Sequence, residues 1–557
     1  MMRSGFLLLC LFIFSHAKGQ YSRHIIELTD KKGSPYQLNN PAAFLSPESI
    51  KRKSFFKIAI DSSDLPVSPV YLDSIRKAGK VEIIGFSKWM NMLLIKTTDA
   101  ATLNKIGQFP FVKKRTAIAN RPSPSYSLKT KDTVFETSGA NELKMKAATA
   151  LNYGRSNQQI SIHEGEFLHN AGWTGSGIKI AVLDAGFNRY QNISAFDSLR
   201  VRDGIKMTRD LIENTNSVNE DDAHGMYCLS ILAANLPGTM VGTAPHASYY
   251  LFRTEDAYSE FPVEEFYWVS AAEMADSIGV SLISSSLGYS TFDDPSFNYS
   301  YAGMNGKTTL ISRGASLASK KGIIVMNSAG NEGSKPWKYV IAPADSEEIL
   351  AVGAVNTLKQ VAPFSSYGPT SDGRVKPEIA SVGWNTFLIS TTGNVVQGSG
   401  TSFSNPNIAG LIACLWQAFP EFNNKEIMDA IKKSSDRYSN PDTRTGYGIP
   451  NMRIAFDMLE KERLTRKAKA ILKNERIKVY PNPFNNQITL VYFHEKATNL
   501  AVSIMSMDGK TIQKKVFSTP GGEYHFFTID GLFSLPKGQY LLKYEDVTGK
   551  GIMRLQK

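Results

Sequence analysis

Three short motifs, in one order along the chain, bring together a carboxylate, an imidazole and a hydroxyl. Asp184 follows a run of apolar residues, His224 precedes a glycine, and Ser402 lies in a stretch rich in glycine and serine. These groups can make a weakly nucleophilic serine attack an acyl carbon, because the imidazole takes the hydroxyl proton while the carboxylate orients the imidazole. The residue types therefore predict nucleophilic serine catalysis.

The three residues are expected at the ends of regular elements. The run before Asp184 is typical of a buried strand, and functional groups of open α/β sheets gather at such carboxyl ends. His224 opens an apolar helical stretch, and Ser402 precedes the apolar run Ile408–Phe419, with Pro406 expected in the first helical turn. Each residue alone also has a structural explanation, as a turn aspartate, a capping or surface histidine and an N-cap serine.

Further motifs accompany the three residues, and Asp, His, Ser is a known order for a triad on an α/β sheet. On these motifs, residues 156–458 resemble the subtilisin-like serine peptidases (S8 family). The resemblance implies a mostly parallel sheet covered by helices. The additional stretches that resemble family signatures are Ile283–Gly288, Asn327–Gly333, Phe364–Glu378 and Gly446–Gly448.

The resemblance also implies a role for each site residue. Ser402 would be the nucleophile, His224 the general base and acid, and Asp184 the group that orients the imidazole, while Asn331 and the Ser402 N–H would hold the oxyanion. This chemistry requires no cofactor. Structural calcium is an option by family likeness, although no dense carboxylate loop names its ligands. The residues expected to line the substrate cleft are Ser286, Leu287, Gly288, Ser328, Ala329 and Gly330.

The chain departs from the usual family pattern beside the base and the nucleophile. Met226 and Tyr227 follow the His-Gly pair, and Phe403 follows the serine, which leaves cleft shape and side-chain preference open. Cys228 resembles the cysteine of a thiol-bearing branch of the family, and inert packing is the simpler interpretation. Only Cys228 and Cys414 follow the N-terminal apolar run, too few for a disulfide framework, and the sequence leaves their pairing open.

The N-terminal part is predicted to be removed in stages. Residues 1–19 have the layout of a secretory signal peptide, cut before Gln20 or, alternatively, before Lys18. Residues 20–120 are predicted to form a small α+β unit that resembles the family's inhibitory prosegments, and residues 121–155 a polar connector that contains the processing site. The expected strands are Lys80–Phe86, Met90–Lys96 and Phe111–Ala119, and the expected helices are Leu65–Ala78 and Ala100–Ile106.

Charge and hydropathy exclude two classes of partner. The net charge is +12, but residues 461–478 hold eight Lys/Arg and two Glu, so half of the excess lies in one short segment. We interpret residues 459–476 as a solvated basic linker and expect no nucleic-acid partner. After the signal peptide no stretch approaches the roughly 20 apolar residues of a membrane helix, so no transmembrane segment is expected.

Residues 477–557 show short alternating strands, with turns at Asp508-Gly509 and Pro520-Gly-Gly522, and are predicted to form a β-sandwich. The expected strands include Ile488–Phe493, Leu500–Met505 and Tyr540–Glu545. The pattern resembles the type IX secretion sorting domain of Bacteroidetes, which implies that the type IX machinery is a partner and that the chain passes through the periplasm and outer membrane. The alternative is an accessory substrate-binding module.

The function that these features favour is a secreted serine endopeptidase, made as a zymogen, that cleaves protein or peptide substrates through an acyl-enzyme. One alternative is an inactive scaffold, such as a surface adhesin or peptide binder, although that role would not require the oxyanion donor Asn331. A serine esterase is the other alternative, but no Gly-x-Ser-x-Gly elbow surrounds Ser402.

Overall fold

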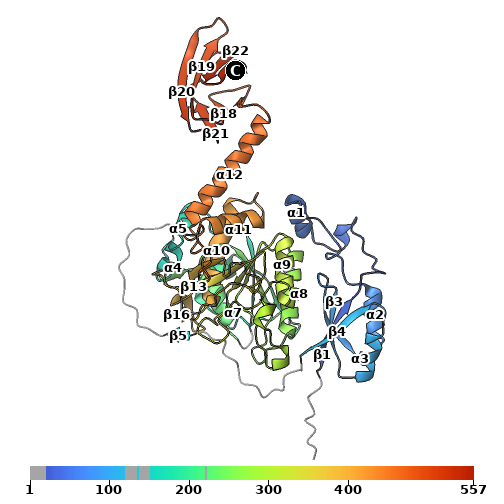
Figure 1. Cartoon of the computed structure of the whole chain (residues 1–557). Coiled ribbons are helices and arrows are strands. Elements are labelled where there is room, and N and C mark those ends of the chain that lie inside the picture. Colours follow the sequence, from blue (N-terminus) through green and yellow to red (C-terminus); the bar gives the residue numbers. More distant parts are fainter. Residues whose placement is uncertain (1–20, 120–133, 137–150, 220–221) are drawn as a thin grey trace, which may run out of the picture. The chain divides into compact units, whose positions relative to one another are not determined.

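A computed structural model describes residues 21–119, 134–136, 151–219 and 222–557. The backbone divides into two compact units, with the boundary between Ala455 and Phe456. The first unit contains an N-terminal α+β segment (residues 21–119) and an α/β region, and the second contains the C-terminal strands (Figure 1).

The α/β region is built on a sheet of seven strands in the order β14-β13-β12-β11-β6-β10-β7, in which every neighbouring pair is parallel. The inner strands are buried along their length, as parallel strands covered on both faces must be. This arrangement confirms the predicted fold class. The strands are β6 (Lys179–Asp184), β7 (Ile205–Asp210), β10 (Ser248–Arg253), β11 (Leu282–Ser285), β12 (Ile324–Ser328), β13 (Leu350–Val355) and β14 (Ile379–Val382).

Helices cover both faces of this sheet (Figure 1). Helices α8 (Val263–Ser277) and α9 (Leu310–Lys320) pack together on one face, where Trp268 is fully buried in the main apolar cluster. Helices α7 (His224–Ala233) and α10 (Thr401–Ala418) pack together on the other face. Smaller elements are α4 (Asn157–Ser161), α5 (Glu166–Asn170), α6 (Asp197–Val201), α11 (Asn424–Lys433), β8 (Asn235–Leu236), β9 (Met240–Val241), β15 (Thr386–Ile389) and β16 (Val395–Ser399).

The N-terminal segment is a four-stranded antiparallel sheet in the order β2-β3-β1-β4, with three short helices. All five elements expected from the sequence are present, which confirms the α+β prediction. Its elements are β1 (Arg23–Leu28), α1 (Pro47–Phe55), α2 (Pro69–Arg76), β2 (Glu82–Ser87), β3 (Met92–Lys96), α3 (Ala100–Gly107) and β4 (Val112–Ala119).

The N-terminal segment docks on α8 through a buried carboxylate. Glu273 of α8 accepts hydrogen bonds from the backbone N–H groups of Lys88 (2.9 Å) and Trp89 (3.0 Å) and from the Ser87 hydroxyl. Burial raises the pKa of Glu273. Apolar residues of the segment and of α8 form one cluster beside it, so the contact combines polar and apolar groups.

Ion pairs tie a second part of the N-terminal segment to the helices. Arg52 pairs with Asp276 of α8, and Asp64 pairs with Lys53 (3.2 Å) and with Lys321 after α9 (2.9 Å). Burial alone would raise the pKa of Asp64, but the two lysines hold it below its ordinary value. Each of these charges therefore has an opposite charge within reach, as buried ions require.

The second unit contains two antiparallel sheets, β17-β18-β21 and β20-β19-β22-β23, which share one apolar core. This confirms the predicted β-sandwich, including its three expected strands. The expected linker segment lies mostly within one helix, α12 (Met452–Leu472). No described helix is long and apolar enough to cross a membrane. The strands are β17 (Ile477–Tyr480), β18 (Ile488–His494), β19 (Thr498–Ser506), β20 (Thr511–Thr519), β21 (Glu523–Ile529), β22 (Gln539–Asp546) and β23 (Gly549–Gln556).

Candidate active site

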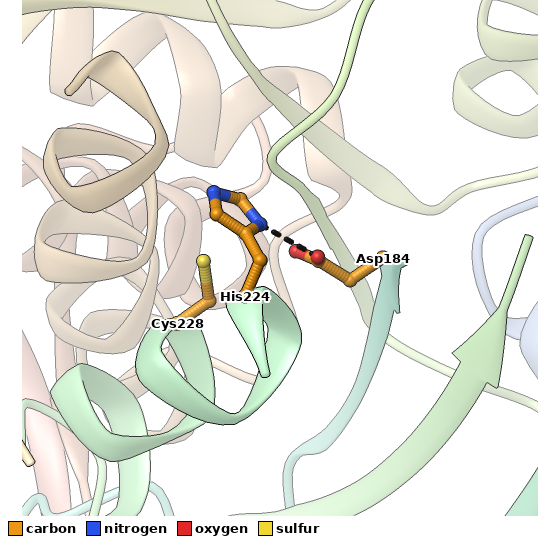
Figure 2. Close-up of side chains that lie close together, drawn as sticks. All are labelled: Asp184, His224 and Cys228. Atoms are coloured by element: carbon orange, nitrogen blue, oxygen red, sulfur yellow. Dashed lines mark hydrogen bonds and ion pairs between the residues drawn. The ribbon is translucent and has the colours of Figure 1, made fainter. Parts of the chain in front are cut away.

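Asp184 and His224 meet at the carboxyl end of the central strand β6. Asp184 is the last residue of β6 and His224 the first of α7, as the sequence predicts. The His224 Nδ1 lies 2.6 Å from the Asp184 Oδ1, and both side chains are buried (Figure 2). The same Oδ1 accepts the backbone N–H of Ala185 (2.8 Å). Since Asp184 accepts at Nδ1, the Nε2 atom of a neutral His224 is left as the proton acceptor.

The short distance between β6 and α7 depends on glycine. A Cβ on Gly225 would lie 2.6 Å from the Gly186 carbonyl oxygen and 2.8 Å from the Asp184 Cβ. Any side chain at this position would therefore push α7 away from β6. Asp222 completes the entry to the helix, because its Oδ1 accepts the backbone N–H of His224 (2.6 Å).

Ser402 is the second residue of α10, which starts earlier than the sequence indicates. Pro406 lies inside the helix rather than in its first turn, so that expectation is wrong. A proline there removes the N–H that would bond to the Ser402 carbonyl oxygen. The oxygen instead accepts hydrogen bonds from the Ser286 hydroxyl (2.9 Å) and the Cys228 thiol (3.4 Å).

Cys228 thus has a structural contact beside the site. Burial raises the pKa of its thiol well above the ordinary value, which keeps the thiol a hydrogen-bond donor. Figure 2 shows its sulfur one helical turn beyond His224. Cys228 and Cys414 are both buried and not joined to each other, which answers the pairing question that the sequence leaves open.

His224 and Ser402 line one cavity of about 510 Å³. The Ser402 hydroxyl donates to the Ser286 carbonyl oxygen (3.2 Å), so its hydrogen must turn away from that oxygen before it can pass to His224. Catalytic hydrogen bonds commonly tighten only when substrate is bound. The arrangement therefore places a base, a hydroxyl and an open volume together.

Asn331 lies on the same cavity, in contact with the first residue of α10. Its side-chain oxygen accepts the Thr401 N–H and the Thr401 hydroxyl, both at 2.9 Å. These bonds fix the amide with its oxygen toward the helix, which leaves its NH₂ group as a donor. The Ser402 N–H belongs to the first turn of α10, whose N–H groups have no partner within the helix. Asn331 and Ser402 thus each bring a hydrogen-bond donor to residues that line this cavity.

Five of the six residues expected to bind substrate line this cavity, namely Ser286, Leu287, Gly288, Ser328 and Gly330. Ala329 does not, because its side chain is fully buried in a cluster with Val340, Ala344 and Ala351. The prediction did not include the acidic residues of the cavity. Those are Glu260, Asp293 and Glu332; Glu332 lies within a recognised motif and Asp293 five residues after another, but nothing in the sequence marks Glu260.

Two of the departures from the usual family pattern, Met226 and Phe403, are buried outside the cavity lining. Phe403 is fully buried, with its ring 6.1 Å from that of His224, and Met226 is fully buried on α7. Neither residue is part of the cavity lining. They support the helices that carry the base and the serine.

Two groups of described side chains have the spacing of metal ligands. Asp184, His224 and Cys228 form one, but a thiol and an imidazole do not suit calcium. Glu255, Glu260 and Glu264 form the other, with hard oxygen ligands. Spacing is the only feature of these three carboxylates that points to an ion, so we assign no calcium site to them.

Family models match three parts of the chain. Residues 175–448 match the subtilase family, residues 23–134 match the Peptidase S8 propeptide domain of Bacteroidota, and residues 478–556 match a secretion system C-terminal sorting domain. The three matches follow one another in the order predicted from the sequence.

Individual relatives agree with these matches. Subtilisin NAT of Bacillus subtilis subsp. natto is 29% identical over 291 residues, which are 52% of this chain and 68% of the relative. Subtilisin J of Geobacillus stearothermophilus is 27% identical over 394 residues, which are 69% of this chain and 93% of the relative. The crystal structure of fervidolysin from Fervidobacterium pennivorans has the same fold (TM-score 0.54, 16% identity, 95% of this chain and 71% of that one). Residues 175–448 thus form a subtilase domain, and the chain is a serine protease with a propeptide domain and a sorting domain that directs it to the cell surface or the extracellular space.

Proposed function

We propose that the protein is an endopeptidase that works through an Asp184-His224-Ser402 triad. His224 Nε2 takes the proton of Ser402 as its Oγ attacks the carbonyl carbon, and then passes that proton to the leaving amine. A water molecule, activated by the same nitrogen, hydrolyses the acyl-enzyme. Asp184 stabilises the imidazolium that forms in both halves. The 2.6 Å contact between Asp184 and His224 is the observation that supports this proposal most directly.

The cleft binds an extended peptide in this proposal. Ser286, Leu287 and Gly288 follow β11 along the cavity, so their backbone groups can pair with a substrate strand. Ser328 and Gly330 form a wall of the primary specificity pocket. An extended chain can enter such an open cleft at any internal bond, which makes the enzyme an endopeptidase rather than one that needs a free terminus.

The remaining parts of the chain regulate and route this activity in our proposal. The N-terminal segment acts as an intramolecular inhibitor until it is cut away, and the C-terminal sandwich engages the type IX secretion machinery. We keep the domain boundaries predicted from the sequence, in which successive parts of the chain end at residues 19, 120, 155, 458 and 476. The signal peptide and most of the connector lie outside the described residues.

Labelling with a fluorophosphonate tests the proposed nucleophile. After an added protease has removed the N-terminal segment, we expect the probe to modify the intact protein at Ser402, as read by peptide mass spectrometry. A Ser404→Ala variant is the matched control, because Ser404 is buried two residues further along α10 and donates to the Thr401 carbonyl oxygen. Modification elsewhere, or none, contradicts the triad.

Asn331→Ala is expected to lower kcat by about 10²–10³-fold with little change in KM, the size of effect that removing one oxyanion donor has. The reason is that the side-chain NH₂ is needed only once charge develops on the acyl oxygen. Steady-state kinetics on a fluorogenic peptide measure both constants. An equal rise in KM instead would mean that Asn331 binds the substrate's ground state, and it would contradict the oxyanion role.

A further inference from the structure

The cavity that contains Ser402 carries a net negative charge. Its charged lining residues, among those that the structure describes, are Glu260, Asp293, Glu332 and Lys335. Lys335 lies 3.3 Å from Glu332, so one of the carboxylates has a cation beside it. Three carboxylates and one ammonium leave two negative charges in the cavity, whichever of them pair with one another. A peptide that fills this cavity therefore meets an excess of negative charge.

Glu260 and Asp293 lie side by side, although 33 residues separate them in the sequence. The backbone N–H of Glu260 donates to the Asp293 Oδ2 (3.1 Å), and the backbone N–H of Asp293 donates to the Glu260 carbonyl oxygen (3.0 Å). These two bonds join the loop before α8 to the loop after β11. Asp293 is exposed and Glu260 half-buried, so a molecule in the cavity can reach both residues at one place on the wall.

Two further carboxylates lie behind Glu260. Glu255 and Glu264 are buried, and one carboxylate oxygen from each of the three residues lies within 4.8 Å of the other two. The Glu255 Oε1 accepts the Tyr289 hydroxyl (3.2 Å), and the Glu264 Oε1 accepts the backbone N–H of Asp256 (2.7 Å). Such hydrogen bonds favour the ionised form of a carboxyl group. Both charges add to the negative potential at Glu260, and water screens them little because they are buried.

The charge of the whole chain has the opposite sign. The sequence carries a net charge of +12, whereas residues 255–265 hold five Asp/Glu and no Lys, Arg or His. A protein of positive net charge repels a cationic peptide at long range, so an attraction for such a peptide must come from the cavity itself. This contrast makes a local preference distinguishable from a general electrostatic effect.

We propose that the protease prefers substrates with a lysine or arginine within four residues of the cut bond, and that Glu260 and Asp293 bind this side chain. The inference rests on the proposed function, which gives the cavity its peptide-binding role. An ammonium or guanidinium group donates charge-assisted hydrogen bonds to carboxylates, and these are stronger than bonds between neutral groups. Glu255 and Glu264 act on the substrate only through the potential that they add at Glu260.

A panel of internally quenched peptides tests this preference. The peptides share one sequence and differ at a single position, which holds either arginine or citrulline, a neutral side chain of nearly the same shape. That position is moved along the residues on each side of the cut bond. We expect the ratio of kcat/KM, arginine over citrulline, to reach about tenfold at one position or at two adjacent positions, the size that two partly exposed ion pairs give. The ratio should fall toward one between about 0.05 M and 0.5 M salt, because ions screen such pairs.

The possible failures of this measurement differ from one another. A ratio below about twofold at all positions, in a protein that cleaves the peptides, overturns this inference alone. An equal ratio at every position overturns the assignment to Glu260 and Asp293, since a local pair of carboxylates cannot favour all positions alike. A protein that cleaves no peptide of the panel and takes up no fluorophosphonate overturns the proposed function instead.

Charge-removing variants test the two residues directly. Glu260→Gln and Asp293→Asn keep the size of each side chain, and the double variant should lower the ratio about fivefold or more. Glu347→Gln is the matched control and should leave the ratio unchanged, because Glu347 is exposed and is not part of the cavity lining. Lys335→Gln should raise the ratio, since it removes a positive charge from the cavity.

The ratio cancels any effect that a variant has on folding or on the chemical step, because both peptides share that effect. An intact ratio in the double variant, or an equal fall in Glu347→Gln, would overturn the proposal.

Discussion

Ser402→Ala is expected to lower kcat for peptide hydrolysis by about 10⁶-fold, the size that loss of the nucleophile has in subtilisin. The hydroxyl is the only group at the carboxyl end of β6 and the start of α10 that we assign to attack on the substrate, so no neighbour replaces it. The measurement is the initial rate of cleavage of a fluorogenic peptide, with the N-terminal segment of both proteins removed by an added protease.

This design separates loss of chemistry from loss of maturation, since neither protein needs to process itself. Ser404→Ala, made and treated in the same way, should keep its rate within about threefold. Its hydroxyl donates to the Thr401 carbonyl oxygen, and loss of one such hydrogen bond changes the free energy of folding only modestly. A Ser402→Ala protein that retains more than a hundredth of the intact rate would rule out the triad as the main route.

Asp184→Asn is expected to lower kcat by about 10⁴-fold while the protein stays folded. An amide can turn its NH₂ group toward the His224 Nδ1, now 2.6 Å from a carboxylate oxygen. The imidazole would then carry its proton on Nε2, the atom that must accept the proton of Ser402. Kinetics on the fluorogenic peptide give kcat, and circular dichroism checks the fold.

Asp222→Asn is the matched control for this change. Asp222 also lies next to His224, but it accepts the backbone N–H rather than the ring, and an amide oxygen can do the same. We expect a loss below tenfold. Equal losses in the two variants would show that nearby negative charge in general, and not the tautomer set by Asp184, supports the base.

The sequence predicted the position of the triad because each of its residues borders a strongly apolar element. Asp184 closes a buried strand, and His224 opens a helix. The start of α10 was harder to predict. Residues 401–407 include polar residues and Pro406, which are poor helix formers. The helix extends through them because Ser286 and Cys228, which are distant in sequence, donate hydrogen bonds to the Ser402 carbonyl oxygen.

Two elements of the N-terminal segment were not predicted for a similar reason. α1 carries Arg52 and Lys53 and buries Ser49 and Lys53, so its inward face has no apolar period to detect. β1 is only six residues long and becomes a strand between β3 and β4. The direction of the Ala329 side chain could not be predicted either, because Ala329 follows a strand, β12, that is buried throughout, so no polar–apolar alternation tells which residues meet a cavity.

The contact between α8 and the N-terminal segment affects the solubility of the mature enzyme. Removing the segment uncovers Val263, Phe266 and Tyr267, an apolar strip that could make molecules associate. The same helix also presents Glu273 and Asp276, which lose their protein partners at that moment and become hydrated anions. Like charges on every copy of this strip repel one another, so we expect the protein without its N-terminal segment to keep a colloidally stable face there.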